Sequence, residues 1–188
     1  MLGRIGAPWL LVKHASDLDT SAGLIMPGGE STTMLKFFEN EGLGAAFLEF
    51  AAQGKPIFGT CAGAILLAKE VLNPPQARLG LIDITVERNA YGRQIDSAVR
   101  PVTFAEFRQD GTRVEPTAGM MFIRAPIIRR IGKGVRVLGR ADGMPVLVEQ
   151  GSVMAATFHP ELTDDERVHR YFVGKVLAGA GGRSSGGQ

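Results

Sequence analysis

Residues 56–63 read PIFGTCAG and place the only cysteine of the chain, Cys61, in a G-x-C-x-G pentapeptide. The apolar residues before the pentapeptide predict a short buried strand, and residues 64–71 after it predict a helix. A strand, a sharp turn and a helix in this order are the setting of a nucleophile elbow, here with sulfur in place of the serine oxygen. The stretch therefore predicts an α/β fold in which Cys61 lies at the end of a strand.

Two features of the pentapeptide favour a reactive Cys61 over a cysteine that only fills apolar space. The flanking Gly59 and Gly63 allow a strained turn and a close approach of helix and strand. A position at the start of a helix exposes the sulfur to unpaired N–H groups, which favour thiolate over thiol. A lone cysteine is more often a small buried apolar residue, but the two glycines and the strand–helix context favour the nucleophile.

Apolar runs and turn residues alternate in the first third of the chain. Residues 9–12 and 23–26 are continuous apolar runs that predict strands buried on both faces. Helices are predicted at about 32–40 and 43–53, before the strand at 56–59. This order predicts a parallel sheet with helices on both faces.

After residue 75 the pattern changes to strands with little helix between them. Residues 150–152 predict a hairpin turn, and 163–166 start a last helix, to about Leu177, with a capping-box pattern. We therefore expect a three-layer α/β domain with a mixed sheet. The strands predicted in this half are 81–87, 98–103, 120–124, 135–140, 145–150 and 153–158.

Composition narrows the class of protein. The 188 residues contain 45% hydrophobic and 21% charged residues with a net charge of +2, which is typical of a soluble globular protein. No dense lysine or arginine run supports binding to nucleic acid or a membrane surface. A single cysteine fits a reducing compartment, and we expect a cytoplasmic protein. One domain is predicted over residues 1–177, followed by a disordered Gly/Ser tail at 178–188.

His159 and Glu161 follow the predicted strand 153–158 and leave the sheet at its end. Residues two apart in an extended stretch point to the same side, so Glu161 can orient the imidazole of His159. His159 can in turn reach Cys61, which gives a nucleophile, a base and an orienting carboxylate. A solvated His–Glu loop pair is the alternative, which the nearby elbow disfavours.

Acyl transfer by a thiolate also needs donors for the developing oxyanion. The backbone N–H of Ala62 directly follows the nucleophile, and a second donor is expected from Gly29 in the Pro-Gly-Gly loop at 27–29. The loop alone would be an ordinary turn. His14 and His169 have no metal-ligand spacing with another ligand, so we expect no metal site and no cofactor, and assign these histidines no role.

Five segments together resemble one family, the glutaminase subunit of pyridoxal 5′-phosphate synthase, which is a class I (triad) glutamine amidotransferase. The resemblance runs from about Gly6 to the final helix. The cysteine elbow and His-x-Glu are shared by many triad amidotransferases, whereas the first, third and fourth segments are much more specific. The segments read PGGESTT at 27–33, GTCAG at 59–63, ERNAYGRQ at 87–94, FIRAP at 122–126 and FHPELT at 158–163.

The resemblance implies a reaction and its residues. Cys61 attacks the side-chain amide of L-glutamine, His159 protonates the departing ammonia, and water then hydrolyses the thioester with His159, oriented by Glu161, as base. The positions that match the family's glutamine-binding residues are Gly29, Glu30, Ser31, Arg88, Ile123 and Arg124. Without the resemblance, Arg88 and Arg124 would be interpreted as members of surface ion pairs.

The resemblance also implies a partner. Ammonia passes to a separate TIM-barrel synthase subunit, which combines it with a pentose phosphate and a triose phosphate, and both subunits form a large hetero-oligomer. The implied fold is class I glutamine amidotransferase-like (flavodoxin-like). Compared with the family, this sequence lacks the usual first strand and most of the first helix, and residues 1–5 match only the end of that helix. We therefore expect that translation starts upstream of Met1.

Three other functions remain open from the sequence. One is a triad amidotransferase that serves another acceptor, such as a nucleotide or amino-acid pathway. Another is a catalytically silent docking subunit, and a third is a cysteine peptidase on a related elbow. Glutamate release in the presence of the synthase would separate them.

Overall fold

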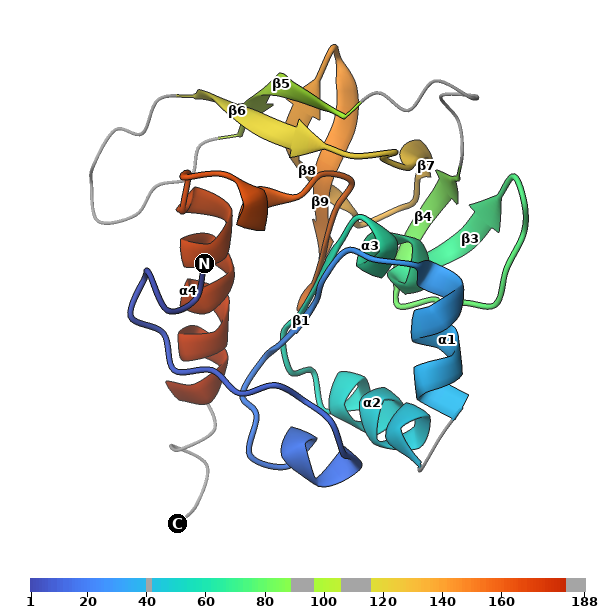
Figure 1. Ribbon diagram of the computed structural model, residues 1–188, viewed down its shortest axis with the longest axis vertical. Coiled ribbons are helices and arrows are strands. Elements are labelled where there is room, and N and C mark those ends of the chain that lie inside the picture. The colour runs from blue at the N-terminus through green and yellow to red at the C-terminus, as the bar shows by residue number, and fades with distance from the viewer. Residues whose placement is uncertain (40–41, 89–96, 106–115, 182–188) are drawn as a thin grey trace.

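The main sheet has seven strands in this computed structural model, which describes residues 1–39, 42–88, 97–105 and 116–181 (Figure 1). β1, β2 and β10 are parallel, whereas β9, β8, β5 and β6 continue the sheet with antiparallel pairing. The prediction of a mixed sheet is therefore confirmed. In spatial order the strands are β1 (Leu24–Met26), β2 (Ile57–Thr60), β10 (Val153–Ala156), β9 (Met144–Gln150), β8 (Arg136–Ala141), β5 (Ala98–Phe104) and β6 (Thr117–Phe122).

Helices cover both faces of the sheet and complete three layers. α1 (Ser31–Glu39), α2 (Leu43–Ala52) and α3 (Ala62–Leu67) cover one face, and α4 (Arg167–Gly181) covers the other (Figure 1). Two apolar clusters fill the spaces on either side of the sheet. The central strands supply both clusters because successive side chains of a strand point to opposite faces.

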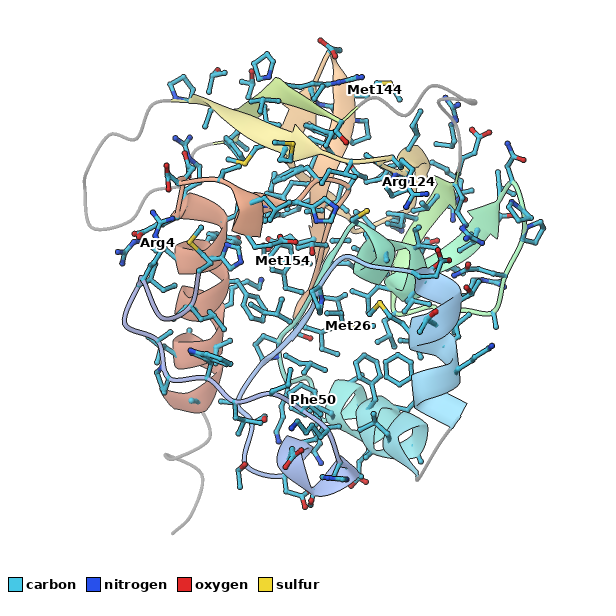
Figure 2. The ribbon with its side chains drawn as sticks, in the orientation of Figure 1. Arg4, Met26, Phe50, Arg124, Met144 and Met154 are labelled. Atoms are coloured by element: carbon cyan, nitrogen blue, oxygen red, sulfur yellow. The ribbon has the colours of Figure 1, made fainter. Side chains whose placement is uncertain are left out.

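Neighbouring residues on β2 and β10 illustrate this alternation. Ile57 and Val153 belong to the cluster under α1, α2 and α3, whereas Phe58 and Met154 belong to the cluster under α4. Met154 and Met26 accordingly lie on opposite sides of the sheet (Figure 2). The uninterrupted apolar runs of the sequence therefore correspond to strands that are buried on both faces.

Part of one predicted helix is instead a strand of a second, three-stranded sheet. This sheet contains β3 (Ala68–Leu72), β4 (Ile82–Glu87) and β7 (Ile127–Ile131), of which β7 was not predicted. The helix expected over residues 64–71 ends at Leu67 as α3, and the chain continues as a strand. Pairing with β4 outweighs the local helix preference, because Glu70 accepts a hydrogen bond from Thr85 at 2.7 Å in the cross-strand register.

The strand predicted at residues 9–12 is also wrong. The segment is irregular, and Trp9 and Leu11 are 66% and 68% exposed. Among the described strands only β2 pairs with β1, and none pairs with residues 9–12. A strand needs a neighbour for its backbone hydrogen bonds, so the apolar pattern alone does not make one here.

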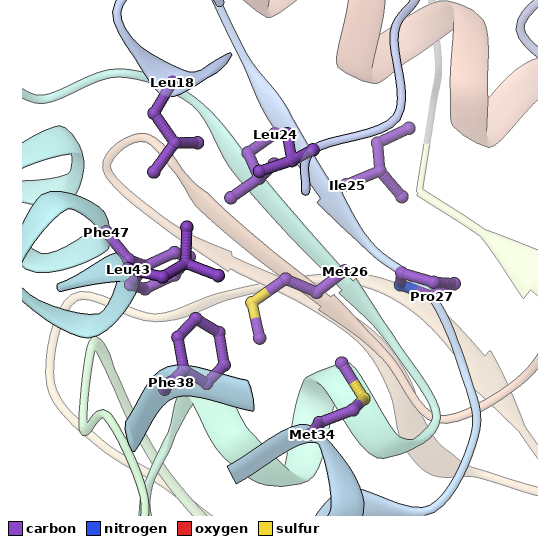
Figure 3. Close-up of a pocket in the computed structure, with 10 residues that line it drawn as sticks. Leu18, Leu24, Ile25, Met26, Pro27, Met34, Phe38, Leu43 and Phe47 are labelled. Carbon is purple, nitrogen blue, oxygen red and sulfur yellow. The ribbon is translucent and has the colours of Figure 1, made fainter. Parts of the chain in front are cut away.

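An apolar cavity of about 140 Å³ lies between β1 and the helices α1 and α2 (Figure 3). Side chains of β1, α1 and α2 line most of it. A short 3₁₀ helix, η1 (Ala15–Leu18), contributes Leu18. The labelled lining residues include Leu24, Met26, Met34, Phe38, Leu43 and Phe47.

The end of the chain differs from its prediction in two ways. α4 begins at Arg167 rather than near Thr163, because side chains of the preceding polar run bind backbone N–H groups instead. Thr163 Oγ1 accepts from the N–H of Asp165 at 3.3 Å, and Asp165 accepts from the N–H of Arg167 at 3.0 Å. The helix then continues to Gly181, so residues 178–181 of the predicted tail are helical. Residues 182–188 lie outside the described residues, as do residues 89–94 of the ERNAYGRQ segment.

Candidate active site

Cys61 lies in the turn between β2 and α3 and has a strained backbone, with φ of +48°. Its N–H donates to the carbonyl of Ala156 on β10 at 2.8 Å, which fixes the turn to the neighbouring strand. A positive φ is uncommon for a residue with a Cβ and is the geometry of a nucleophile elbow. The strained turn predicted by the sequence is therefore present, with the strain at the cysteine itself.

The two glycines of the pentapeptide provide space rather than unusual torsions. A Cβ on Gly59 would lie 2.6 Å from the carbonyl carbon of Gly63, and a Cβ on Gly63 would overlap the carbonyl oxygen of Met26 on β1. Side chains at either position would force α3 away from the sheet. The glycines thus allow the helix to pack directly on β1 and β2 behind Cys61.

His159 follows β10 and is held by both its backbone and its ring. Its N–H donates to the carbonyl of Met121 on β6 at 2.8 Å. Its Nδ1 lies 2.8 Å from Oε1 of Glu161, which belongs to the short 3₁₀ helix η2 (Pro160–Leu162). The predicted contact is therefore present, although the turn of η2, and not an extended stretch, brings the carboxylate to the imidazole.

The loop after β1 packs against the other side of this imidazole. A Cβ on Gly28 would overlap Cε1 of His159, so no other residue fits there without moving the ring. The sequence indicated that the Pro-Gly-Gly loop approaches the site, but it did not indicate that Gly28 contacts His159. Only the spatial proximity of β1 and β10, each parallel to β2, reveals that contact.

The pKa of His159 is raised to about 9, first by its hydrogen bond with Cys61 and then by its hydrogen bond with Glu161. Partial burial opposes both effects, because it disfavours a charged ring. At neutral pH the ring therefore carries a proton beside the sulfur atom.

Glu161 remains ionised despite its burial. Burial alone raises the pKa of this carboxyl, but the hydrogen bond from His159 and that from its own backbone N–H outweigh it and hold the pKa below its ordinary range. Thr60, directly before Cys61, places its hydroxyl 3.5 Å from Oε1 of the same carboxylate. Thr60 is a site residue that the sequence analysis missed, although it lies inside the decisive pentapeptide.

Two of the predicted glutamine-binding residues, Glu30 and Arg88, lie next to each other in the structure. They form an ion pair with each other, with 3.9 Å between a guanidinium nitrogen and a carboxylate oxygen. The side chain of Arg88 is only 15% exposed and that of Glu30 is 58% exposed. A cation and an anion at this spacing match the two charges of an amino-acid zwitterion.

Ser31, the first residue of α1, is buried and donates a hydrogen bond to the side-chain oxygen of Gln76 at 2.9 Å. No pattern in the sequence indicated Gln76, which follows Pro74-Pro75 in a loop. Its amide nitrogen is buried and has no hydrogen-bond partner among the described residues. Gln76 therefore supports the loop that carries Gly29 and Ser31.

The remaining predicted residues lie at the ends of β6 and α3. The carbonyl oxygen of Ile123 is 3.9 Å from the sulfur of Cys61. Arg124 follows with a positive φ of +44° and an exposed side chain, which Figure 2 labels. Ala62 begins α3 directly after Cys61 and is buried.

The described part of the chain contains no cluster of three or more His, Cys, Asp or Glu side chains that could hold a metal ion. Among the same residues, no helix has the length and apolar character required to cross a membrane.

Comparisons with known proteins agree with the geometry. Residues 2–178 match the model of the SNO glutamine amidotransferase family. The chain is 55% identical over 176 residues to the pyridoxal 5′-phosphate synthase subunit PdxT of Solibacter usitatus, covering 93% of this chain and 90% of that protein. The corresponding subunit of Koribacter versatilis is 49% identical over 182 residues, with coverages of 97% and 90%.

A solved structure described as a glutamine amidotransferase superposes with a TM-score of 0.83. It is 43% identical, and the match covers 94% of this chain and 90% of the other. These similarities confirm the family and the class I amidotransferase-like fold that the sequence segments indicated. The chain belongs to the SNO glutamine amidotransferase family.

Proposed function

We propose that this chain is the glutaminase subunit of a pyridoxal 5′-phosphate synthase. It hydrolyses L-glutamine to L-glutamate and ammonia, and the ammonia is used by a synthase partner. The observation that carries the proposal is the arrangement of Cys61, His159 and Glu161 in a chain 55% identical to a PdxT subunit. We also keep the cytoplasmic location as a prediction.

The first half of the reaction uses the charged state of His159. The deprotonated sulfur of Cys61 attacks the side-chain amide carbon of glutamine and forms a tetrahedral intermediate. His159 then gives its proton to the amide nitrogen, the C–N bond breaks, and ammonia leaves. A glutamyl thioester on Cys61 and a neutral imidazole remain.

The second half needs His159 as a base. The hydrogen bond with Cys61 is the largest cause of the raised pKa, and acylation of the sulfur removes it. The pKa of the ring therefore falls when the thioester forms, and neutral His159 can take a proton from the attacking water. Water adds to the thioester, glutamate leaves, and the sulfur–imidazolium pair is restored. Glu161 keeps Nδ1 of the ring oriented through both steps.

Substrate binding and oxyanion stabilisation use the loops around the pair. The N–H groups of Ala62 and Gly29 are the proposed donors to the oxyanion. Arg88 binds the substrate carboxylate, and Glu30 binds its ammonium group. Ser31, Ile123 and Arg124 complete the binding site through the loop before α1 and the end of β6.

The proposed partner is a TIM-barrel synthase subunit in a large hetero-oligomer. It receives the ammonia and combines it with a pentose phosphate and a triose phosphate. Ammonia is small and neutral, so direct transfer between subunits avoids its protonation and loss in water.

Isotope labelling tests the whole proposal. The chain is mixed with its cognate synthase, both sugar phosphates and glutamine carrying ¹⁵N in the side-chain amide. We expect glutamate release and pyridoxal 5′-phosphate that carries the heavy nitrogen, both lost in Cys61→Ala. Glutamate release without labelled product would indicate another acceptor. Absence of glutamate release from the wild type would indicate a silent docking subunit.

A further inference from the structure

His169 lies on α4 and is only 3% exposed, although Arg167 and Arg170 lie close to it in the sequence. Its ring meets the ring of Phe58 edge to face, with 6.0 Å between the centroids and 78° between the planes. Phe58 and Thr60 are two residues apart on β2, so their side chains point to the same face of the sheet. His169 therefore packs beneath the strand end that carries Thr60 and Cys61.

Two buried polar atoms remain without a hydrogen-bond partner among the described residues of this region. They are Nδ1 of His169 and Oε2 of Glu161. The other carboxylate oxygen, Oε1, already faces His159 at 2.8 Å and Thr60 at 3.5 Å. Buried polar groups are rarely left unpaired, and a pair of such atoms in one region is a common site for a buried water.

Phe58, which His169 contacts, and Thr60, whose hydroxyl faces Glu161, lie on the same face of β2, and the charges of His169 and Glu161 influence each other. Burial lowers the pKa of His169 to about 4, while the charge of Glu161 acts in the opposite direction. Burial raises the pKa of Glu161, and His169 contributes to lowering it, after the hydrogen bonds and the charge of His159. The charged groups that act on His169 are Glu161 and the α-amino group of Met1, while β2 presents the apolar Phe58. A neutral imidazole is thus available as a hydrogen-bond donor at neutral pH.

We propose that His169 is a positioning residue for the glutaminase site, joined through one buried water from its Nδ1 to Oε2 of Glu161. The catalytic consequence of this role rests on the proposed function. A carboxylate held at only one oxygen can rotate about its terminal torsion, which is broad in energy. Holding Oε2 keeps Oε1 aimed at Nδ1 of His159, and so keeps the imidazole aligned with Cys61.

Two variants of matched shape test the proposal. His169→Asn keeps a donor close to the position of Nδ1, whereas His169→Leu has nearly the same shape and no donor. In the complex with the synthase, we expect His169→Leu to lower kcat for glutamine about tenfold, as for other lost orienting partners. We expect KM to change by less than about twofold, because substrate binding is not touched. His169→Asn should restore most of kcat.

A second measurement does not depend on the reaction. In the chain labelled at its histidine rings, NMR titration should give a His159 pKa of about 9 in the wild type. That value should be lower in His169→Leu and close to the wild type in His169→Asn. Thermal unfolding of each variant identifies loss of folding, and His169→Phe, which fills the space against Phe58, replaces His169→Leu if the latter does not fold.

The outcomes separate the two proposals. A wild-type complex without glutaminase activity contradicts the proposed function, and the NMR titration then still decides the role of His169. Equal kcat and equal His159 titration in the Leu and Asn variants would overturn the positioning role. So would a loss of kcat in both variants that follows their loss of thermal stability.

Discussion

At the scale of single residues, the site depends on how Cys61 and Glu161 hold a proton on the ring of His159. The hydrogen bond with Cys61 contributes most to the raised pKa of His159, and the hydrogen bond with Glu161 contributes next. The same ring helps to keep the Glu161 carboxylate charged despite its burial. A change at Cys61 or Glu161 should therefore move the pH at which His159 loses its proton.

Glu161→Gln should move the alkaline limit of activity. The wild type needs a protonated His159, so kcat/KM for glutamine should fall as pH rises through about 9. Loss of the carboxylate charge removes a cause that raises this pKa, so the fall should begin at lower pH. The loss of kcat should be smaller, by about two orders of magnitude, than in Cys61→Ala or His159→Ala. An unchanged alkaline limit would contradict the role of Glu161.

Arg88→Ala should weaken glutamine binding more than it slows the reaction. The guanidinium is the proposed partner of the substrate carboxylate, and its loss should raise KM about tenfold or more. Arg170→Ala, on the exposed side of α4, is the control and should leave KM unchanged. Steady-state kinetics of both variants in the complex provide the measurement. A normal KM in Arg88→Ala would remove this residue from the binding site.

At the scale of elements, the close contact of α3 with β1 and β2 sets the position of Cys61. This contact is possible because Gly59 and Gly63 lack side chains. The loop after β1 is held in the same way, since Gly28 lies against the imidazole of His159. Backbone contacts between elements thus determine the distance between sulfur and imidazole.

Gly63→Ala should therefore destabilise the fold and impair activity together. Its methyl group would overlap the carbonyl oxygen of Met26, and the strain should cost about 1–3 kcal/mol of unfolding free energy. Gly174→Ala is the matched control in α4, where the methyl group meets open space. Helix propensity predicts that this control gains up to about 1 kcal/mol. Chemical denaturation of both variants tests the contrast, and equal effects would contradict it.

The sequence predicts those elements whose signal is local. The strand, elbow and helix around Cys61 carry their own glycines and apolar runs, and His159 and Glu161 follow a clearly apolar strand. β3 is not predictable locally, because its residues become a strand only through pairing with β4. The strand prediction for residues 9–12 is wrong for the opposite reason, since these residues have a strand-like pattern but no pairing partner among the described strands.

The same distinction applies to the site. Cys61, His159 and Glu161 are predictable because their residue types and spacing indicate their chemistry. The contact of Gly28 with His159, the hydrogen bond between Ser31 and Gln76, and the burial of His169 join segments far apart in the chain. No local pattern encodes these contacts, so only the folded structure reveals them.

At the scale of the whole molecule, two histidines make stability depend on pH in separate ranges. Burial keeps His169 neutral in the folded state with a pKa of about 4, whereas the unfolded chain takes up a proton near 6.5. The unfolded state binds more protons between these values, so stability falls as pH drops through them. The raised pKa of His159 acts from 6.5 to about 9, where stability falls as pH rises.

The fall in stability as pH drops from 6.5 to about 4 should be lost in His169→Leu. In the wild type the free energy of unfolding should fall by about 3 kcal/mol from this group between pH 6.5 and 4. Urea denaturation at several pH values measures the slope. Gly174→Ala, a change on the same helix that alters no titratable group, is the control and should keep the wild-type slope. A wild-type slope in His169→Leu would mean that His169 is not held neutral.

The central claim, that Cys61 is the nucleophile of a glutamine-hydrolysing site, has a direct test. Glutamate release from glutamine is measured for the wild type and Cys61→Ala, each bound to the synthase, with binding checked by size-exclusion chromatography. We predict that the variant binds the synthase normally and releases no glutamate above background. Glutamate release by Cys61→Ala at the wild-type rate would contradict the account.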